Sequence, residues 1–301
     1  MIPRLELPAP AKINLALRVS PIRPDGFHPI ESLVALIDLC DDMTFEPDPR
    51  GGIAVEIDAR SPRAIADIPT DHRNLAAKAA LTLREAAGLD PSRVGVRICI
   101  HKRIPAGAGL GGGSSNAAAT LIALNELWEL SLDAGRLAEI GAAIGSDVPL
   151  FMSTPVSVMR GRGEVVSPST LRLNARIVLL IPPFGCATGA VYRAYDDIGV
   201  DSGADRFAAL LTKGELGASI VSELFNDLEL PASQVEPRLR ALKSRAEHAT
   251  DRPFVLTGSG AAMFTLAPDV MTAGEIAQDL RAELGGACEA VVASPCYADR
   301  S

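Results

Sequence analysis

The stretch PAGAGLGGGSSNAA, residues 105–118, decides the fold of this chain. Five of the seven residues from 107 to 113 are glycine. An alternating apolar strand at 94–100 precedes the stretch, and a strong helix is predicted to follow at 116–130. Glycine lets a ligand approach the main chain, and a helix N-terminus offers unpaired N–H groups and positive dipole charge. The pattern therefore predicts an anion site suited to phosphate rather than a flexible linker.

This loop differs from the two best-known phosphate loops. A Walker A loop needs a lysine directly after its glycines, and none follows here. Gly107, Gly109 and Gly112 satisfy the GxGxxG spacing of dinucleotide-binding folds. In those folds, however, the glycines follow the strand almost at once and an acidic residue ends the next strand. Here residues 102–105 intervene and the helix runs on into another helix, so we set the dinucleotide fold aside.

Composition limits the possible function classes. The chain has 301 residues, 48% hydrophobic and 22% charged, with net charge −8 and only 4% aromatic residues. These values fit a globular protein and disfavour sequence-independent nucleic-acid binding. Five widely spaced cysteines indicate reduced thiols, and the four histidines lack the spacing of a zinc site. No apolar run reaches the length of a membrane span, so we expect a cytoplasmic protein with no nucleic-acid or membrane partner.

The order of predicted elements favours an α+β fold in two domains. Strands are predicted at 11–19, 30–39, 53–57 and 94–100, and helices at 74–87, 116–130 and 133–145. Beyond residue 152 the pattern changes to short strands near 156–159, 176–181 and 255–264 and helices near 188–195, 205–212, 237–248 and 271–284. We therefore expect an N-terminal domain of residues 1–154 and a C-terminal domain of residues 155–301.

Three motifs in this order resemble the GHMP kinase superfamily. They are PAKINL at 10–15, the glycine loop at 105–118 and LTGSGAA at 256–262. The resemblance implies an N-terminal, ATP-binding domain like ribosomal S5 domain 2 and a C-terminal ferredoxin-like α/β plait. It also implies a phosphotransferase that holds the nucleotide phosphates without a Walker A lysine.

Further segments resemble one branch of that superfamily, which acts in the non-mevalonate route to isoprenoid precursors. They are RPDGFH at 23–28, Asn74-Leu75, GSDVP at 145–149 and GRGE at 161–164. The branch phosphorylates, with ATP, the 2-hydroxyl of a cytidine-diphosphate-linked methylerythritol. The resemblance thus implies a small-molecule substrate, ATP and Mg²⁺, in a monomer or weak homodimer.

The resemblance implies that Asp147 and Lys12 are catalytic. Asp147 would act as base or charge partner for the attacking hydroxyl, and Lys12 would keep it ionised and stabilise the transferring phosphoryl group. Taken alone, Asp147 could simply cap the turn before Val148, and Lys12 could point to solvent from its strand.

The remaining matches concern the two substrates. Asn14 lies on the same strand face as Lys12 and could bind substrate hydroxyls. Phe27 and His28 match the pair that packs on and hydrogen-bonds cytosine, with Phe27 keeping the ring of the usual tyrosine but not its hydroxyl. Thr188 and Tyr192 match a second base-binding segment.

ATP is expected along the glycine loop. The matching positions are Asn74 and Lys102 near the adenine, and Pro105, Ala106, Gly107, Ala108, Gly109, Leu110, Gly111, Gly112, Gly113, Ser114 and Ser115 along the phosphates. The two serines could cap the helix, bind phosphate or ligate Mg²⁺. No carboxylate ligand of the metal stands out.

Two other functions remain open at this point. The chain could be another GHMP kinase acting on mevalonate, homoserine or a sugar, although these lack a base for Phe27 and His28 to bind. It could also be a non-catalytic nucleotide- or RNA-binding module. The presence of both Lys12 and Asp147, and the acidic charge balance, disfavour the module.

Overall fold

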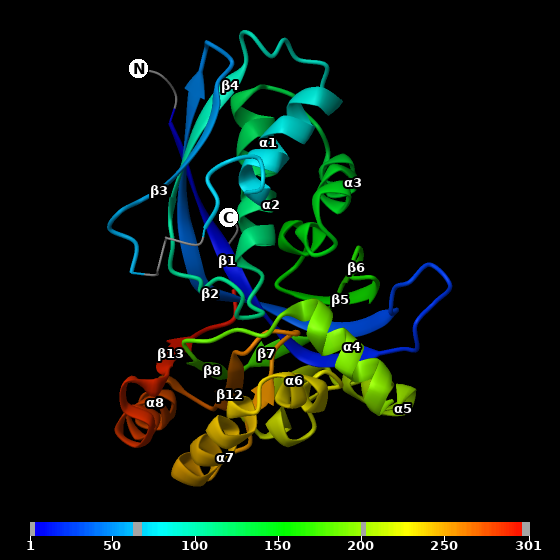
Figure 1. Ribbon diagram of the computed structural model, residues 1–301, viewed down its shortest axis with the longest axis vertical. Coiled ribbons are helices and arrows are strands. Elements are labelled where there is room, and N and C mark those ends of the chain that lie inside the picture. The colour runs from blue at the N-terminus through cyan, green and yellow to red at the C-terminus, as the bar shows by residue number, and fades with distance from the viewer. Residues whose placement is uncertain (1–3, 63–67, 200–202, 297–301) are drawn as a thin grey trace. The chain divides into compact units, whose positions relative to one another are not determined.

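The computed structural model describes residues 4–62, 68–199 and 203–296. The chain divides into two compact units. Unit 1 holds residues 1–11, 39–106 and 111–154, and unit 2 holds residues 12–38, 107–110 and 155–301. The glycine loop therefore contributes residues 107–110 to unit 2 and its remaining glycines to unit 1. The predicted α+β class is confirmed, since both units combine strands and helices (Figure 1).

Unit 1 consists of a layer of strands and a layer of helices; of the long strands β1 and β2 it holds only one end each. Its strands come from β1 (Leu5–Val19), β2 (Ile30–Asp48), β3 (Ile53–Ile57) and β4 (Gly95–His101). Its helices are α1 (Leu75–Ala86), α2 (Gly112–Leu127), α3 (Ala134–Ile144) and the short 3-10 helix η1 (Val148–Met152). β4 pairs antiparallel with the end of β2 and parallel with β3. Figure 1 shows α1 and α2 side by side on one face of these strands.

The alternation seen in the sequence explains how this layer packs. Val96, Ile98 and Ile100 of β4 are buried, while Arg97 between them is exposed. The buried face of α1 is rich in alanine, and so is the facing helix α2. Small side chains allow the two helix axes to approach closely. Burial of these apolar residues against the strands is the main stabilising contribution to unit 1.

Helix α2 begins earlier than the sequence predicted. It starts at Gly112 instead of residue 116, with Gly111 as its N-cap in the left-handed region at φ 74°. The prediction was wrong because the glycine run reads as loop, whereas its last two residues already have helical backbone. The early start matters for function, because the unpaired N–H groups of α2 belong to the glycine loop itself.

Unit 2 is built on a four-stranded antiparallel sheet in the order β11-β12-β8-β13. The sheet strands are β8 (Arg176–Ile181), β11 (Val255–Leu256), β12 (Met263–Ala267) and β13 (Glu289–Ala293). The large helices are α4 (Thr188–Ile198), α5 (Ala204–Leu211), α6 (Glu229–Val235), α7 (Arg238–Thr250) and α8 (Val270–Leu284). Helices α4, α5, α6 and α7, with short elements among them, separate β8 from β11, and α8 separates β12 from β13. This is the split βαββαβ order expected of a ferredoxin-like plait.

Shorter elements complete unit 2. They are β5 (Val156–Gly161), β6 (Val165–Pro168), β7 (Arg172–Asn174), β9 (Glu215–Gly217), β10 (Phe225–Asn226), η2 (Ala218–Ser222) and η3 (Gly285–Ala287). β5 pairs with the beginning of β2, and β10 pairs in parallel with β1 at Ala16 and Leu17. The core of the unit joins the plait to helices α4, α6, α7 and α8, with Phe254 and Leu180 buried at its centre.

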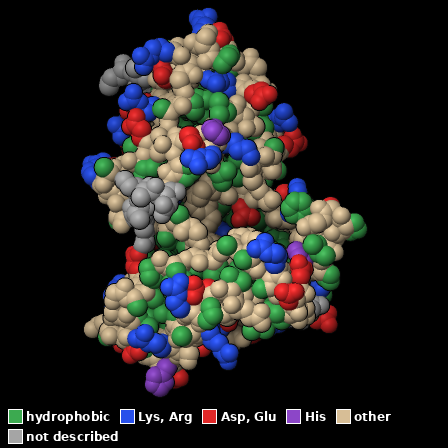
Figure 2. Space-filling model, viewed as in Figure 1, with side chains coloured by type: hydrophobic (Ala, Val, Ile, Leu, Met, Phe, Trp, Pro, Cys, Tyr) green, Lys and Arg blue, Asp and Glu red, His purple; other side chains and the backbone are tan. Residues whose placement is uncertain are grey.

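Charge is mixed over the surface. On the face drawn in Figure 2, basic and acidic side chains of the described residues are interspersed over each unit. Nonspecific nucleic-acid binding uses a stripe of one positive sign, which this face does not present. In the part of the chain described, no helix combines the length and apolar character needed to cross a bilayer.

Candidate active site

The three sequence motifs meet through their backbones in unit 2. The N–H of Lys12 donates to the carbonyl of Leu110 at 3.0 Å, and the N–H of Ala262 donates to the carbonyl of Ala108 at 3.1 Å. Residues 107–110 of the glycine loop therefore lie between the N-terminal motif and the third, LTGSGAA motif. Segments separated by some 100 to 150 positions in the chain form one backbone-bonded assembly.

Gly109 requires its glycine for two reasons. Its φ of +84° lies in the region that side chains rarely adopt, and a Cβ there would come within 2.4 Å of the Thr257 carbonyl oxygen. Gly107 also has positive φ, at +71°, but nothing lies within 4 Å of a Cβ built there. The loop is thus tight against the third motif at Gly109 and open at Gly107, where a ligand could approach the main chain.

Lys12 is buried, contrary to the alternative that it points to solvent. It is 5% exposed, and its Nζ donates to Asn14 Oδ1 at 2.5 Å. A Cβ on Gly258 would lie 3.1 Å from the same Nζ, so the ammonium sits against the third motif. Asn14 Oδ1 also accepts from the hydroxyl of Thr257 at 3.3 Å. A buried cation close to a glycine-rich backbone is suited to an anionic ligand.

Asp147 lies in unit 1 at the start of η1, where it takes the N-cap position. Its side chain makes no capping hydrogen bond, which removes the alternative that this carboxylate serves to cap the turn. Val148, Pro149 and Leu150 directly after it are buried and anchor the turn. Lys78 of α1 donates to the carbonyl of Ile144 at 3.1 Å and fixes the segment that leads into Asp147.

The two serines of the loop differ in their surroundings. Ser115 is 1% exposed, and its hydroxyl has no hydrogen-bond partner among the described residues. Neither serine is the N-cap, because that position belongs to Gly111. The capping role offered by the sequence is therefore wrong. A buried hydroxyl without a partner is costly in a native protein, so Ser115 is a candidate for contact with a ligand at the loop.

Lys102 and Asn74 have structural partners for their side chains. Lys102 is 5% exposed and forms an ion pair with Asp41, which is fully buried. Asn116 Nδ2 donates to the same carboxylate at 2.9 Å, and the N–H of Ile104 donates at 2.9 Å. Asn74 caps α1 through the N–H of Ala76 at 2.9 Å. The side chains of both predicted nucleotide-binding residues therefore make structural contacts within unit 1.

The predicted base-binding residues come together in unit 2. His28 Nδ1 lies 2.9 Å from the carbonyl of Ser20, and its Nε2 lies 3.1 Å from Asp196 Oδ1. Its ring centroid is 5.4 Å from that of Tyr192, which the sequence placed at the same site. Both ring nitrogens of His28 therefore face protein oxygens, so the side chain serves to hold this segment in place.

Phe27 offers the open aromatic face. It is 49% exposed, and the guanidinium carbon of Arg162 lies 4.9 Å from its ring centroid. The exposed ring is free to stack on a planar group, as the sequence predicted for this position. Thr188, the first residue of α4, reaches the third motif by a 2.9 Å hydrogen bond between its hydroxyl and that of Ser259.

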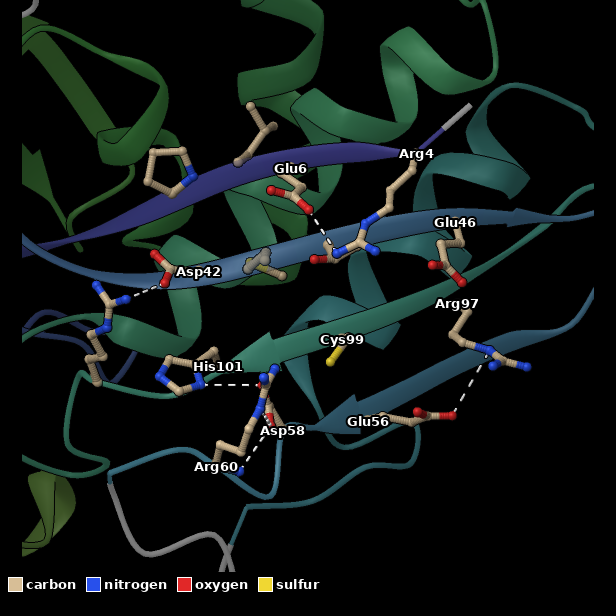
Figure 3. Close-up of a pocket in the computed structure, with 15 residues that line it drawn as sticks. Arg4, Glu6, Asp42, Glu46, Glu56, Asp58, Arg60, Arg97, Cys99 and His101 are labelled. Atoms are coloured by element: carbon tan, nitrogen blue, oxygen red, sulfur yellow. Dashed lines mark hydrogen bonds and ion pairs between the residues drawn. The ribbon is translucent and has the colours of Figure 1, made fainter. Parts of the chain in front are cut away.

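A cavity of about 720 Å³ lies elsewhere, on the outer face of the strands of unit 1 (Figure 3). None of the predicted site residues lines it. Its charges pair with one another: Arg4 with Glu6, Arg60 with Asp58, and Arg103 with Asp42. Hydrogen bonds from Arg60 hold the pKa of Asp58 well below its usual range. Because its charges are already compensated, this cavity is not the phosphate site.

Sequence reasoning missed several residues of the site. Asp41 and Asn116 hold Lys102, while Ser32 and Thr257 hold Asn14. Asn116 and Thr257 stand inside the quoted motifs, so their position was a usable signal. Asp41 and Ser32 lie in the long strand β2 and become visible only through the fold.

Comparison with known proteins places these features in a family. Residues 74–154 match the model of the GHMP kinases N terminal domain. A 4-diphosphocytidyl-2-C-methyl-D-erythritol kinase of Moorella thermoacetica is 39% identical over 282 residues, which is 92% of this chain and 95% of the relative. The same-named protein of Pelotomaculum thermopropionicum is 37% identical over 275 residues, covering 91% and 92%.

The chain belongs to the 4-diphosphocytidyl-2-C-methyl-D-erythritol kinase family.

Solved structures agree with this family. A crystal structure of a 4-(cytidine 5'-diphospho)-2C-methyl-D-erythritol kinase superposes with TM-score 0.72 at 34% identity, covering 96% of this chain and 99% of the other. A homoserine kinase from Cytophaga hutchinsonii also gives TM-score 0.72, with 97% and 95% coverage but only 16% identity. The second likeness concerns the fold alone. The expected GHMP kinase fold is confirmed, and membership in a kinase family decides against a non-catalytic binding module.

Proposed function

We propose that the protein transfers the γ-phosphoryl group of ATP to the 2-hydroxyl of 4-diphosphocytidyl-2-C-methyl-D-erythritol, a step in isoprenoid precursor biosynthesis. The observation that carries the proposal is the buried Lys12 ammonium, held against the third glycine motif in a chain of this kinase family. A buried cation beside a glycine-rich backbone is suited to a phosphoryl group that gains charge on transfer.

The glycine loop binds the ATP phosphates in this proposal. Residues 107 and 111 have positive φ, and the N-terminal N–H groups of α2 follow directly. Such a helix start attracts anions through its free donors and its dipole. The residues from Pro105 to Ser115 thus contribute mainly backbone. The neighbouring side chains of Asn74 and Lys102 keep the surrounding walls in place.

Mg²⁺ fits the loop at its serines. The buried hydroxyl of Ser115 has no hydrogen-bond partner among the described residues. Its oxygen can ligate Mg²⁺, or its proton can be donated to a phosphate oxygen. Among the described residues, however, no cluster of three or more acidic, histidine or cysteine side chains forms a metal site. Ser115, with Ser114 beside it, would therefore hold the metal together with ATP itself, where the ion offsets phosphate charge.

Asp147 and Lys12 divide the chemistry between them. The 2-hydroxyl loses its proton as the phosphoryl group arrives, and the carboxylate of Asp147 receives or attracts that proton. Lys12 supplies fixed positive charge, which stabilises the transferring group. Asn14 holds Lys12 and also borders the substrate hydroxyls.

The cytidine end of the substrate binds at Phe27. Its exposed ring provides a stacking face for the base, and Arg162 above it can pair with a phosphate. His28 and Tyr192 hold this segment, and Thr188 links it to the third motif. We further propose that the protein works in the cytoplasm as a monomer or weak homodimer.

A substrate panel tests the proposal. The protein is incubated with ATP and Mg²⁺ together with the cytidine compound, mevalonate, homoserine or galactose, and products are detected by mass spectrometry. We expect one added phosphoryl group on the cytidine compound alone. A product from another alcohol, with none from the cytidine compound, would move the protein to a different GHMP kinase activity.

A further inference from the structure

A chain of buried hydrogen bonds leads from strand β2 to Lys12. Ser32 of β2 and Thr257 are both 0% exposed, and Asn14 and Lys12 of β1 are each 5% exposed. The side chain of Asn14 lies at the centre of the chain. It contacts Ser32 through Nδ2 at 2.8 Å, and Lys12 through Oδ1 at 2.5 Å. All four residues belong to unit 2.

The hydrogen bond between Ser32 and Ala16 determines where the protons lie in this series of hydrogen bonds. Ser32 Oγ lies 2.7 Å from the carbonyl oxygen of Ala16, which can only accept a hydrogen bond. The hydroxyl proton of Ser32 is therefore used there. Toward Asn14, Ser32 Oγ can then only accept, so the group that faces it must be the amide NH₂. The carbonyl oxygen of Asn14 consequently faces the Lys12 ammonium.

The Lys12 ammonium supports the same orientation independently, and Thr257 is compatible with it. Its Oγ1 accepts from the backbone N–H of Asn14 at 2.9 Å and donates to Asn14 Oδ1 at 3.3 Å. A reversed amide would set NH₂ against the ammonium of Lys12. In a buried site, opposing donors carry a large penalty because water cannot compensate them.

We propose that Ser32 is a positioning residue for catalysis, acting through Asn14 on Lys12. By accepting from the Asn14 amide, Ser32 keeps the amide oxygen toward Lys12 and so holds the ammonium against Gly258, where a Cβ would be only 3.1 Å away. The inference rests on the proposed role of Lys12. It adds a residue of β2 that contacts neither substrate in the proposed reaction.

Two substitutions of equal shape isolate the hydroxyl. Ser32→Thr keeps the hydroxyl, whereas Ser32→Val has the same branched shape without it. Both carry the same packing cost, so their difference reports the hydrogen bond. We expect kcat of Ser32→Val to be on the order of tenfold below that of Ser32→Thr, the scale of one hydrogen bond to a polar partner in a buried network. For each substrate, ATP and the cytidine compound, the KM values of the two variants should agree within about twofold.

A control variant and a double-mutant cycle between positions 14 and 32 complete the test. Ser157→Ala removes another fully buried serine hydroxyl, on β5, and should lower the melting temperature while leaving kcat unchanged. The two variants are also made in an Asn14→Asp background. A carboxylate has two equivalent oxygens and so has no orientation for residue 32 to fix. In that background, Thr and Val at position 32 should therefore give nearly the same kcat.

The outcomes separate this inference from the proposed function. Wild-type transfer to the cytidine compound, together with loss of transfer in Lys12→Met, establishes the parent proposal. If the Thr and Val variants at position 32 then show equal kcat, or differ in KM as much as in kcat, the positioning role of Ser32 is overturned. If Lys12→Met keeps wild-type turnover, the assigned role of Lys12 fails instead, and the inference fails with it.

Discussion

The backbone of Gly260 packs directly against the backbone of Ala108. A Cβ on Gly260 would lie 2.2 Å from the carbonyl carbon of Ala108 and 2.3 Å from the nitrogen of Gly109. The N–H of Ala262 donates to the Ala108 carbonyl, which fixes the pair at this distance. The third motif thus acts as a backing for the first part of the glycine loop, and the two cannot separate without losing this packing.

Gly260→Ala should therefore damage the loop. Backbone atoms cannot swing away as a flexible side chain does, so the added methyl forces the loop to move. We expect a loss of about 1–3 kcal/mol in the free energy of unfolding and a raised KM for ATP. Thermal denaturation and initial-rate kinetics measure the two effects.

Gly274→Ala is the matched control for this substitution. Gly274 lies within α8, and nothing lies within 4 Å of a Cβ built there. Alanine favours helix over glycine by about 0.5–1 kcal/mol, so this variant should be slightly more stable and fully active. Equal behaviour of the two alanine variants would contradict the close packing assigned to Gly260.

Ser115→Ala should separate stability from activity. The hydroxyl has no protein partner among the described residues, so its removal costs the folded state nothing and could raise stability by about 1 kcal/mol. If it holds Mg²⁺ or phosphate, kcat/KM for ATP should fall on the order of tenfold or more, the scale of a lost hydrogen bond to a charged group. Rates at graded Mg²⁺ concentrations measure this effect.

Thr265→Val provides the comparison for Ser115. Thr265 of β12 also carries a buried hydroxyl without a partner among the described residues, but it lies outside the motifs. Its removal should leave the rate unchanged at every Mg²⁺ concentration. If the Ser115→Ala enzyme keeps the normal dependence of its rate on Mg²⁺, the hydroxyl of Ser115 does not contact the metal or the phosphates.

Asp41→Asn should destabilise unit 1 strongly. Asp41 accepts hydrogen bonds from Lys102, Asn116 and two backbone N–H groups, at Arg103 and Ile104, while fully buried. Removing the charge leaves the Lys102 ammonium buried without an anion, at a cost of about 3–5 kcal/mol. Chemical denaturation would show the loss directly.

The neighbouring Asp42→Asn makes the matched control. Asp42 pairs with Arg103, but its side chain is 53% exposed and that of Arg103 is 47% exposed. Ion pairs at the surface contribute about 0–1 kcal/mol, so this variant should unfold almost like the wild type. If the two variants unfold alike, the buried cluster around Lys102 does not stabilise unit 1.

Phe27→Ala should weaken only the cytidine substrate. Loss of one stacking face costs about 1–3 kcal/mol, which appears as a raised KM for this substrate with unchanged KM for ATP. Met271→Ala, at a side chain 79% exposed on α8, is the control and should alter neither constant. Equal weakening of both substrates in the Phe27 variant would indicate general damage instead of a lost base contact.

Local patterns predicted much of the fold. Alternation in the strand at 94–100 and the alanine-rich helix at 74–87 correspond closely to β4 and α1. Two-residue strands such as β10, and the late strand β13, were missed because their pairing partners lie far away in the chain. Such elements depend on tertiary contacts rather than on their own sequence period.

The candidate site rests on motif resemblance more than on local sequence patterns. The motifs identified Lys12 and Thr188, but only the fold showed that Lys12 is buried and bonded to Asn14. The ion pair of Lys102 with Asp41 joins residues 61 positions apart, which no local pattern can reveal. Conversely, the sequence offered a capping role for the loop serines that the left-handed Gly111 makes unnecessary.

Phosphoryl transfer to the 2-hydroxyl can be tested by locating the phosphate on the product. Carbon 2 of the methylerythritol carries the methyl group and no hydrogen, so a phosphate on its oxygen has no three-bond coupling to a carbinol proton. Proton-coupled ³¹P NMR of the product should therefore show one new monoester signal without such splitting, beside the two diphosphate signals. A new monoester signal split by carbinol protons would place the phosphoryl group on another hydroxyl and contradict transfer to the 2-hydroxyl.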